Sequence, residues 1–127
     1  MLYVVETDKT PDAVQEILFK AAEENNLGVI NVIDLAEKMR DKGVEYDAET
    51  RIYELCNPKK AKAVLETNPA MSTALPCRIS MYRENGILKL ATIRPTAMIE
   101  LYGQYGLEEV ANEIEDSIKA VMDSAAS

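Results

Sequence analysis

The sequence contains no histidine, no tryptophan and only two cysteines among its 127 residues. Without histidine, the chain lacks the usual general base, a member of serine-type catalytic triads and the commonest ligand of zinc and haem. Two cysteines are too few for the disulfide framework of a small secreted domain, so we expect free thiols in a reducing cytoplasm. We therefore expect no cofactor and no metal site, and the sequence identifies no catalytic residue.

Positive charge is also scarce, with 14 Lys and Arg residues against 22 Asp and Glu residues and a net charge of −8. Nucleic acids and anionic membranes are bound through clustered basic side chains, so we expect neither as a partner. No apolar run approaches the roughly 20 residues that a membrane span needs. The opening residues 1–6 have no basic region before their short apolar run, which argues against a signal peptide.

The composition is that of one globular domain spanning residues 1–127, with 47% hydrophobic and 28% charged residues. A chain of this length buries enough surface to form a core without disulfides or metals. No linker, repeat or low-complexity stretch divides it.

Hydrophobic periodicity and turn residues predict five strands and about four helices. The expected strands cover residues 2–5, 29–33, 50–56, 77–82 and 87–93, and the expected helices begin near residues 11, 35, 58 and 107. Asn85-Gly86 predicts a two-residue hairpin turn that places Met81 opposite Leu90. The acidic residues of the last helix are expected to face solvent. The pattern indicates an α+β domain with a mixed, mostly antiparallel sheet and most helices on one face.

The region between the third strand and the hairpin carries a distinctive set of residues. The set is Leu55-Cys56-Asn57-Pro58, Ala61, Leu65, Leu75-Pro76-Cys77-Arg78, Tyr82 and Gly86. In order and spacing it resembles the signature of the domain of unknown function 302 family. The resemblance extends to about Ile93, and the stretch from Met98 to Gly106 does not match the signature. It implies a TATA-binding-protein-like arrangement of helices on a curved antiparallel sheet and a homodimer, but no established reaction.

The two cysteines each have a structural and a chemical interpretation. If Asn57 caps a helix that Pro58 opens, the helix N-terminus would lower the pKa of the Cys56 thiol. Alternatively, Cys56 is a small apolar residue at a strand end. Cys77 shares one face of its strand with Ile79 and Met81, which points it into the core. If their strands are antiparallel neighbours, both cysteines meet at one edge of the sheet.

Arg78 alternates out of the core beside Ser80 and Tyr82, where it either holds an anionic ligand or is an ordinary surface arginine. The candidate ligand-binding or thiol residues are therefore Cys56, Asn57, Cys77 and Arg78. Residues 103–106 form a Gly-x-x-Gly sequence, but their acidic surroundings favour a turn between helices over a nucleic-acid loop.

Two functional hypotheses follow from these residues. The first is a non-catalytic dimeric module that binds a small ligand or partner against its sheet. The second is a thiol-based redox or sulfur-handling protein that uses Cys56 with Cys77 nearby. A purely structural role as a subunit also remains open, and the sequence does not identify the ligand.

Overall fold

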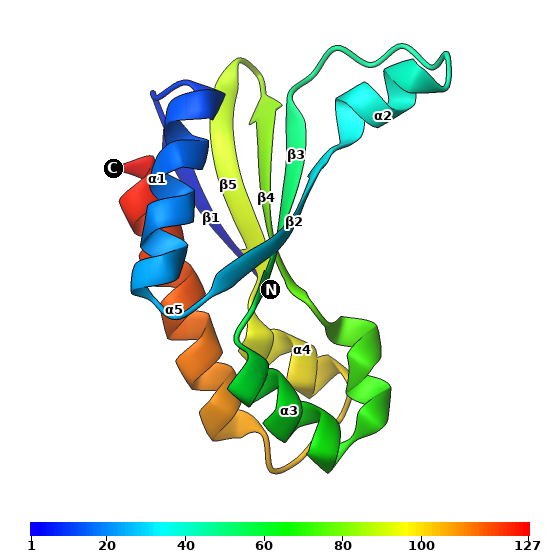
Figure 1. Cartoon of the computed structure of the whole chain (residues 1–127), viewed down its shortest axis with the longest axis vertical. Coiled ribbons are helices and arrows are strands. Elements are labelled where there is room, and N and C mark those ends of the chain that lie inside the picture. Colours follow the sequence, from blue (N-terminus) through cyan, green and yellow to red (C-terminus); the bar gives the residue numbers. More distant parts are fainter.

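The computed structural model describes residues 1–127 as five strands, five α-helices and one 3-10 helix (Figure 1). The strands are β1 (Leu2–Thr7), β2 (Gly28–Asp34), β3 (Thr50–Cys56), β4 (Cys77–Glu84) and β5 (Ile87–Ile93). The helices are α1 (Pro11–Glu24), α2 (Leu35–Asp41), α3 (Pro58–Thr67), η1 (Pro69–Ala74, the 3-10 helix), α4 (Pro95–Leu101) and α5 (Glu108–Ala126).

The sheet is antiparallel throughout, in the order β1-β5-β4-β3-β2. The α+β class and the five strands are confirmed, but the expectation of a mixed sheet is wrong. Two features explain the difference. The strands that flank α1 lie at opposite edges of the sheet and are not neighbours, and α3 and η1 reverse the chain beyond the end of the sheet (Figure 1). Parallel neighbours would need a crossover connection over one face.

The hairpin between β4 and β5 forms where the turn dipeptide predicts it. Asn85 and Gly86 have φ angles of 53° and 81°, and a type I′ turn requires positive φ at both central positions. Met81 lies opposite Leu90, which confirms the predicted register.

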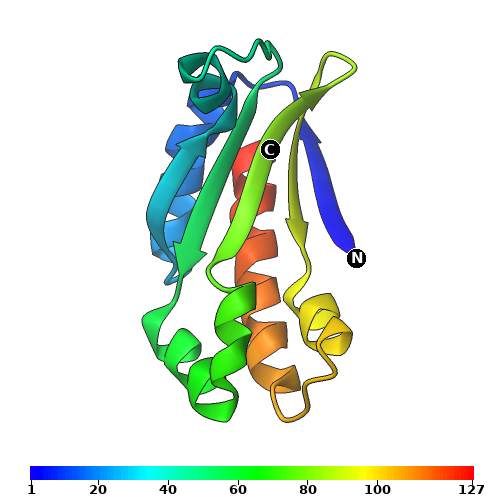
Figure 2. The same ribbon diagram turned by 90° about the vertical axis from the view of Figure 1, so that its right-hand side faces the viewer.

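One face of the sheet is covered by α1 and α5, and the other face is open (Figure 2). Between the layers lies a core of 16 buried residues, among them Leu18 of α1, Tyr53, Met81 and Leu90 of the sheet, and Ile118 of α5. Alternation along β3, β4 and β5 sends every second side chain into this core. Neither α5 nor any other helix is both long and apolar enough to cross a membrane.

The remaining helices α3, η1 and α4 gather beyond one end of the sheet, beside the first turns of α5 (Figures 1 and 2). They enclose a second, smaller core built on Val64, Met71 and Leu107. Sequence patterns did not predict η1, and for α4 they predicted only the turn at residues 103–106 that follows it, without bounds for the helix. Asn68-Pro69 predicts the end of α3, but the Asn68 side chain also accepts a hydrogen bond from the Ala70 N–H at 3.1 Å and so begins η1.

Candidate functional site

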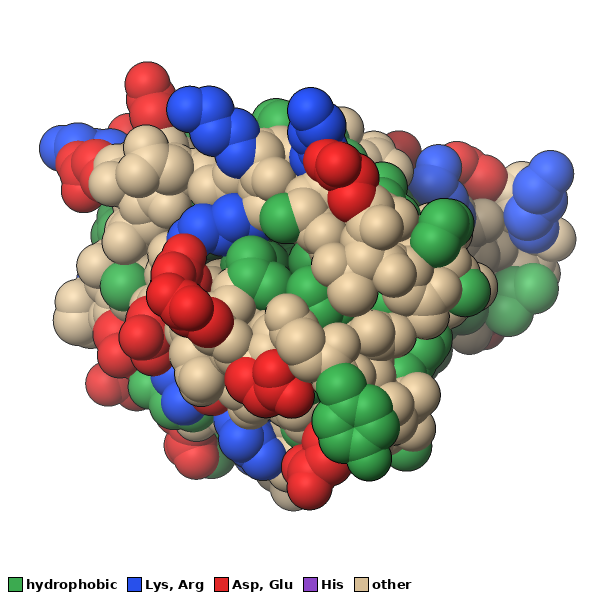
Figure 3. Space-filling view, turned by 90° about the horizontal axis from the view of Figure 1, so that it is seen from below, with side chains coloured by type: hydrophobic (Ala, Val, Ile, Leu, Met, Phe, Trp, Pro, Cys, Tyr) green, Lys and Arg blue, Asp and Glu red, His purple; other side chains and the backbone are tan.

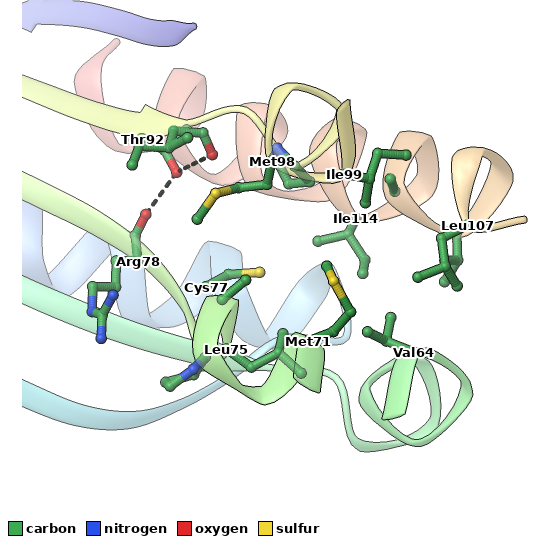
Figure 4. Close-up of a pocket in the computed structure, with 16 residues that line it drawn as sticks. Val64, Met71, Leu75, Cys77, Arg78, Thr92, Met98, Ile99, Leu107 and Ile114 are labelled. Carbon is green, nitrogen blue, oxygen red and sulfur yellow. Dashed lines mark hydrogen bonds between the residues drawn. The ribbon is translucent and has the colours of Figure 1, made fainter. Parts of the chain in front are cut away.

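A cavity of about 110 Å³ lies where the ends of β4 and β5 meet the second helical group. Of its 16 lining residues 12 are hydrophobic, and the wall draws on the sheet, α3, η1, α4 and α5. Figure 4 shows Met71 and Met98 extending into it from η1 and α4. Viewed from below, this end of the molecule has a hollow with hydrophobic side chains at its floor (Figure 3). The site is therefore an apolar pocket.

Only two of the lining residues, Arg78 and Thr92, carry a charge or a hydroxyl group. The Arg78 side chain turns away from the cavity (Figure 4), and its Nε lies 3.2 Å from Oε2 of Glu54. Glu54 also accepts a hydrogen bond from Asn31 Nδ2 at 3.0 Å. Arg78 thus meets the cavity through its backbone, and its guanidinium already has a counterion on the open face. No charged group faces the cavity.

The structure brings Cys56, Asn57 and Cys77 together. Leu55 pairs with Cys77 across the antiparallel β3–β4 ladder, so Cys56 and Cys77 lie at the same end of these two neighbouring strands. Both cysteines and Asn57 line a small cavity of about 20 Å³, and both thiols are free. The Asn57 side chain accepts a hydrogen bond from the Lys60 N–H at 3.2 Å, so it is the N-cap of α3 that the sequence predicted.

The environment of Cys77 suppresses its ionisation. Burial, which is the largest cause, and the neighbouring Cys56 together raise the pKa of the Cys77 thiol to about 11, and the positive charge of Arg78 only partly opposes them. Cys77 is therefore a neutral thiol near pH 7, consistent with its packing against the main core.

We expect Cys77 to react with iodoacetamide about 100-fold more slowly than an ordinary thiol, because the thiolate fraction falls tenfold for each unit of pKa. The measurement is mass spectrometry of the Cys56→Ala variant at pH 7.5, with the same variant in 8 M urea as the reference. Equal rates in the native and unfolded protein would contradict the raised pKa.

Glu115 of α5 holds the cavity wall that α4 forms. Its side chain accepts hydrogen bonds from the Thr96 N–H at 3.1 Å and the Thr96 hydroxyl at 2.6 Å, and it pairs with Lys119 at 3.0 Å. Burial alone would raise the pKa of the Glu115 carboxyl, but the hydrogen bonds from Thr96 and Lys119 outweigh it and lower the pKa. Because Arg94 provides no side-chain cap, Glu115 satisfies the N-terminus of α4 from another helix.

Sequence reasoning placed Glu115 on the solvated face of the last helix, and this was wrong: its exposed fraction is 7%. The only local signal was the spacing of four residues between Glu115 and Lys119. The predicted turn at residues 103–106 is confirmed, since it joins α4 to α5 with Gly103 and Gly106 at φ angles of 63° and 85°.

Fold and cavity together define a small α+β domain with a five-stranded antiparallel sheet, a helical layer on one face and an apolar pocket beyond the sheet's end. The family described as Domain of unknown function DUF302 matches residues 3–125, and the chain belongs to that family. The match extends through the stretch from Met98 to Gly106, which the cysteine motifs alone left unassigned.

A solved structure has the same fold. It is the crystal structure of an uncharacterized conserved DUF302 protein from Bacillus stearothermophilus, with 28% sequence identity and a TM-score of 0.91. The alignment covers 99% of this chain and 98% of that chain. No curated protein matches the chain.

Proposed function

We propose that the protein is a non-catalytic binding module whose cavity takes a small, uncharged, apolar ligand. The observation that carries this proposal is the cavity itself, which measures about 110 Å³ and has mostly hydrophobic walls. Ligand sites are typically concave and lined mostly by hydrophobic side chains with a few polar groups, as this cavity is. For comparison, an engineered apolar cavity of about 150 Å³ stays dry and binds benzene. The cavity described here therefore suits a molecule, or part of a molecule, of similar size.

The character of the wall supports reversible binding rather than catalysis. Met71 and Met98 are unbranched, and their side chains adapt to the shape of a ligand. The thiol that lines the cavity, Cys77, is held in its neutral form, whereas a nucleophile needs the thiolate. Arg78 directs its guanidinium to Glu54 instead of toward a substrate.

The proposal is tested by titrating toluene into the protein and following the methyl signals of its methionines by NMR. Saturable shifts are expected for Met71 and Met98, which line the cavity. Met39 lies in α2 at the other end of the sheet and serves as the internal control (Figure 1). If all methionine signals stay unchanged up to the solubility of toluene, the cavity does not bind apolar ligands.

We also propose that the protein forms a homodimer, as the family resemblance implies. The open face of the sheet carries exposed apolar side chains, with Leu2 57%, Val4 42% and Ile93 43% exposed. Leu2 pairs with Ile93 across the β1–β5 ladder, so these residues form one patch. Apolar patches of this kind are usually covered by a partner.

Sedimentation at micromolar concentration is expected to give twice the monomer mass of 14.1 kDa. Val4→Glu places a charge in the patch and is expected to dissociate the dimer, whereas Phe19→Glu on α1 leaves it intact. A monomer mass for the unmodified protein would refute the dimer, and a dimeric Val4→Glu variant would place the interface elsewhere.

A thiol-based function is the second candidate. It is favoured by the position of Cys56 and Cys77 at one edge of the sheet, around a shared small cavity. In that case Cys56 would be the reactive thiol, because it directly precedes the N-cap of α3. Labelling of Cys56 in the Cys77→Ala variant at pH 6 distinguishes the candidates. A rate well above that of a cysteine peptide supports thiol chemistry, and a rate at or below it removes this candidate.

A further inference from the structure

Thr92 is the only residue of the cavity wall with a side-chain hydroxyl. Its Oγ1 donates to the Arg78 carbonyl oxygen at 2.6 Å and makes a longer contact of 3.4 Å with the Ile93 carbonyl oxygen. Figure 4 shows both contacts at the sheet end of the cavity, beside Met98. Both partners are carbonyl oxygens that can only accept, so the single hydroxyl hydrogen of Thr92 is already engaged with them.

This arrangement leaves the Thr92 oxygen as an acceptor. A hydroxyl group has one hydrogen and two lone pairs, and no donor of the protein bonds to Oγ1 of Thr92. Because carbonyl oxygens hold the hydrogen, the hydroxyl presents lone pairs and not a donor to the cavity. A ligand that offers an O–H or N–H group would satisfy it, whereas a carboxylate or phosphate would find no donor and no positive charge there.

The rest of the wall favours an aromatic ring. None of the lining residues is aromatic, and two of the side chains that enter the cavity, Met71 and Met98, end in thioethers. Thioether sulfur makes favourable contacts with the edges of aromatic rings. A single ring is also close in size to the space of about 110 Å³.

We propose that the ligand class is an uncharged aromatic ring bearing one O–H or N–H group, which donates to Oγ1 of Thr92 while the ring lies between Met71 and Met98. This inference rests on the proposed binding function and names the chemistry of that site. Phenol is the simplest probe of the class, and toluene has the same shape without the donor.

The experiment measures the dissociation constants of phenol and toluene by NMR titration of the methionine methyl signals, in the unmodified protein and in Thr92→Val. Valine keeps the shape of threonine and removes the acceptor. The ratio of toluene to phenol dissociation constants is expected to fall about 3- to 10-fold in Thr92→Val, the usual contribution of one hydrogen bond. Comparing ratios cancels the different hydration of the two probes. Thr92→Ser should preserve the ratio, and Thr50→Val in β3 controls for a loss of hydroxyl outside the cavity.

Each outcome decides a separate claim. Toluene binding in both proteins with an unchanged ratio would overturn the role of Thr92 and leave the apolar binding module standing. Failure of both probes to bind the unmodified protein would overturn the binding function and this inference with it. Toluene binding does not need the hydroxyl, so a Thr92→Val variant that binds neither probe has lost the cavity itself. In that case the ratio of dissociation constants is compared between Thr92→Ser and Thr92→Ala. Equal ratios in those two variants would again reject the role of the hydroxyl.

Discussion

Replacing Glu115 with alanine is expected to lower the free energy of unfolding by about 2 kcal/mol, since it removes a helix cap and leaves half-buried hydrogen-bonding groups without this partner. The groups affected are the N–H and hydroxyl of Thr96 and the ammonium of Lys119. Urea denaturation followed by circular dichroism measures the loss. Glu109→Ala on the exposed side of the same helix is the matched control and should change stability by less than about 0.5 kcal/mol. Equal stabilities of the two variants would contradict the capping role.

The same residue predicts a pH dependence. The pKa of Glu115 is lower in the folded protein than its ordinary value of 4.5, so the folded state favours the carboxylate. This contribution to stability is fully present above about pH 4.5 and is lost as the pH falls through the folded-state pKa. Stability measured between pH 3 and pH 6 should therefore fall less steeply toward acid in Glu115→Gln than in the unmodified protein. Parallel curves would show that Glu115 does not contribute to the acid sensitivity.

Loss of this cap should also affect the cavity, because α4 contributes Met98 and Ile99 to its wall. Toluene is expected to bind the Glu115→Ala variant more weakly than Glu109→Ala at a temperature where both are folded. Equal affinities would indicate that α4 keeps its position without the cap.

Filling the cavity with a larger side chain is the second change for which we expect a large effect, in this case on ligand affinity. Ala74 lies in η1 and lines the pocket, and Ala74→Phe is expected to weaken toluene binding more than tenfold. The physical reason is volume: the added ring is about the size of the benzene that a cavity of about 150 Å³ holds, and it would occupy most of the 110 Å³ available here. Binding is measured by the methionine methyl titration.

Ala70→Phe is the matched control, because Ala70 belongs to the same 3-10 helix but is exposed and does not line the cavity. It should bind toluene as the unmodified protein does. Overpacking costs about 1 to 3 kcal/mol, so thermal unfolding is measured to confirm that Ala74→Phe is folded under the assay conditions. A folded Ala74→Phe variant that binds toluene with unchanged affinity would show that the ligand occupies another site.

Local signals were enough to predict most of the secondary structure. Thr10, Asp34 and Asn57 are N-caps whose side chains accept backbone hydrogen bonds within their own first turns, so each helix start is encoded in a few adjacent residues. The hairpin at Asn85-Gly86 is equally local, because the turn type needs only two residues with positive φ. The sequence also predicted that Cys56 and Cys77 meet, since a strand end and the start of its antiparallel neighbour share an edge.

The sequence by itself therefore determined the α+β class, the family and the starts of the capped helices. Only the tertiary structure decided the strand order, the bounds of α4, the burial of Glu115, the raised pKa of Cys77 and the cavity. Each of these depends on groups far apart in the chain: Thr96 and Glu115 are 19 residues apart, and the cavity wall draws on Val64, Cys77 and Ile114. Periodicity reveals which face of an element is apolar, but the space left between several packed elements depends on how they meet.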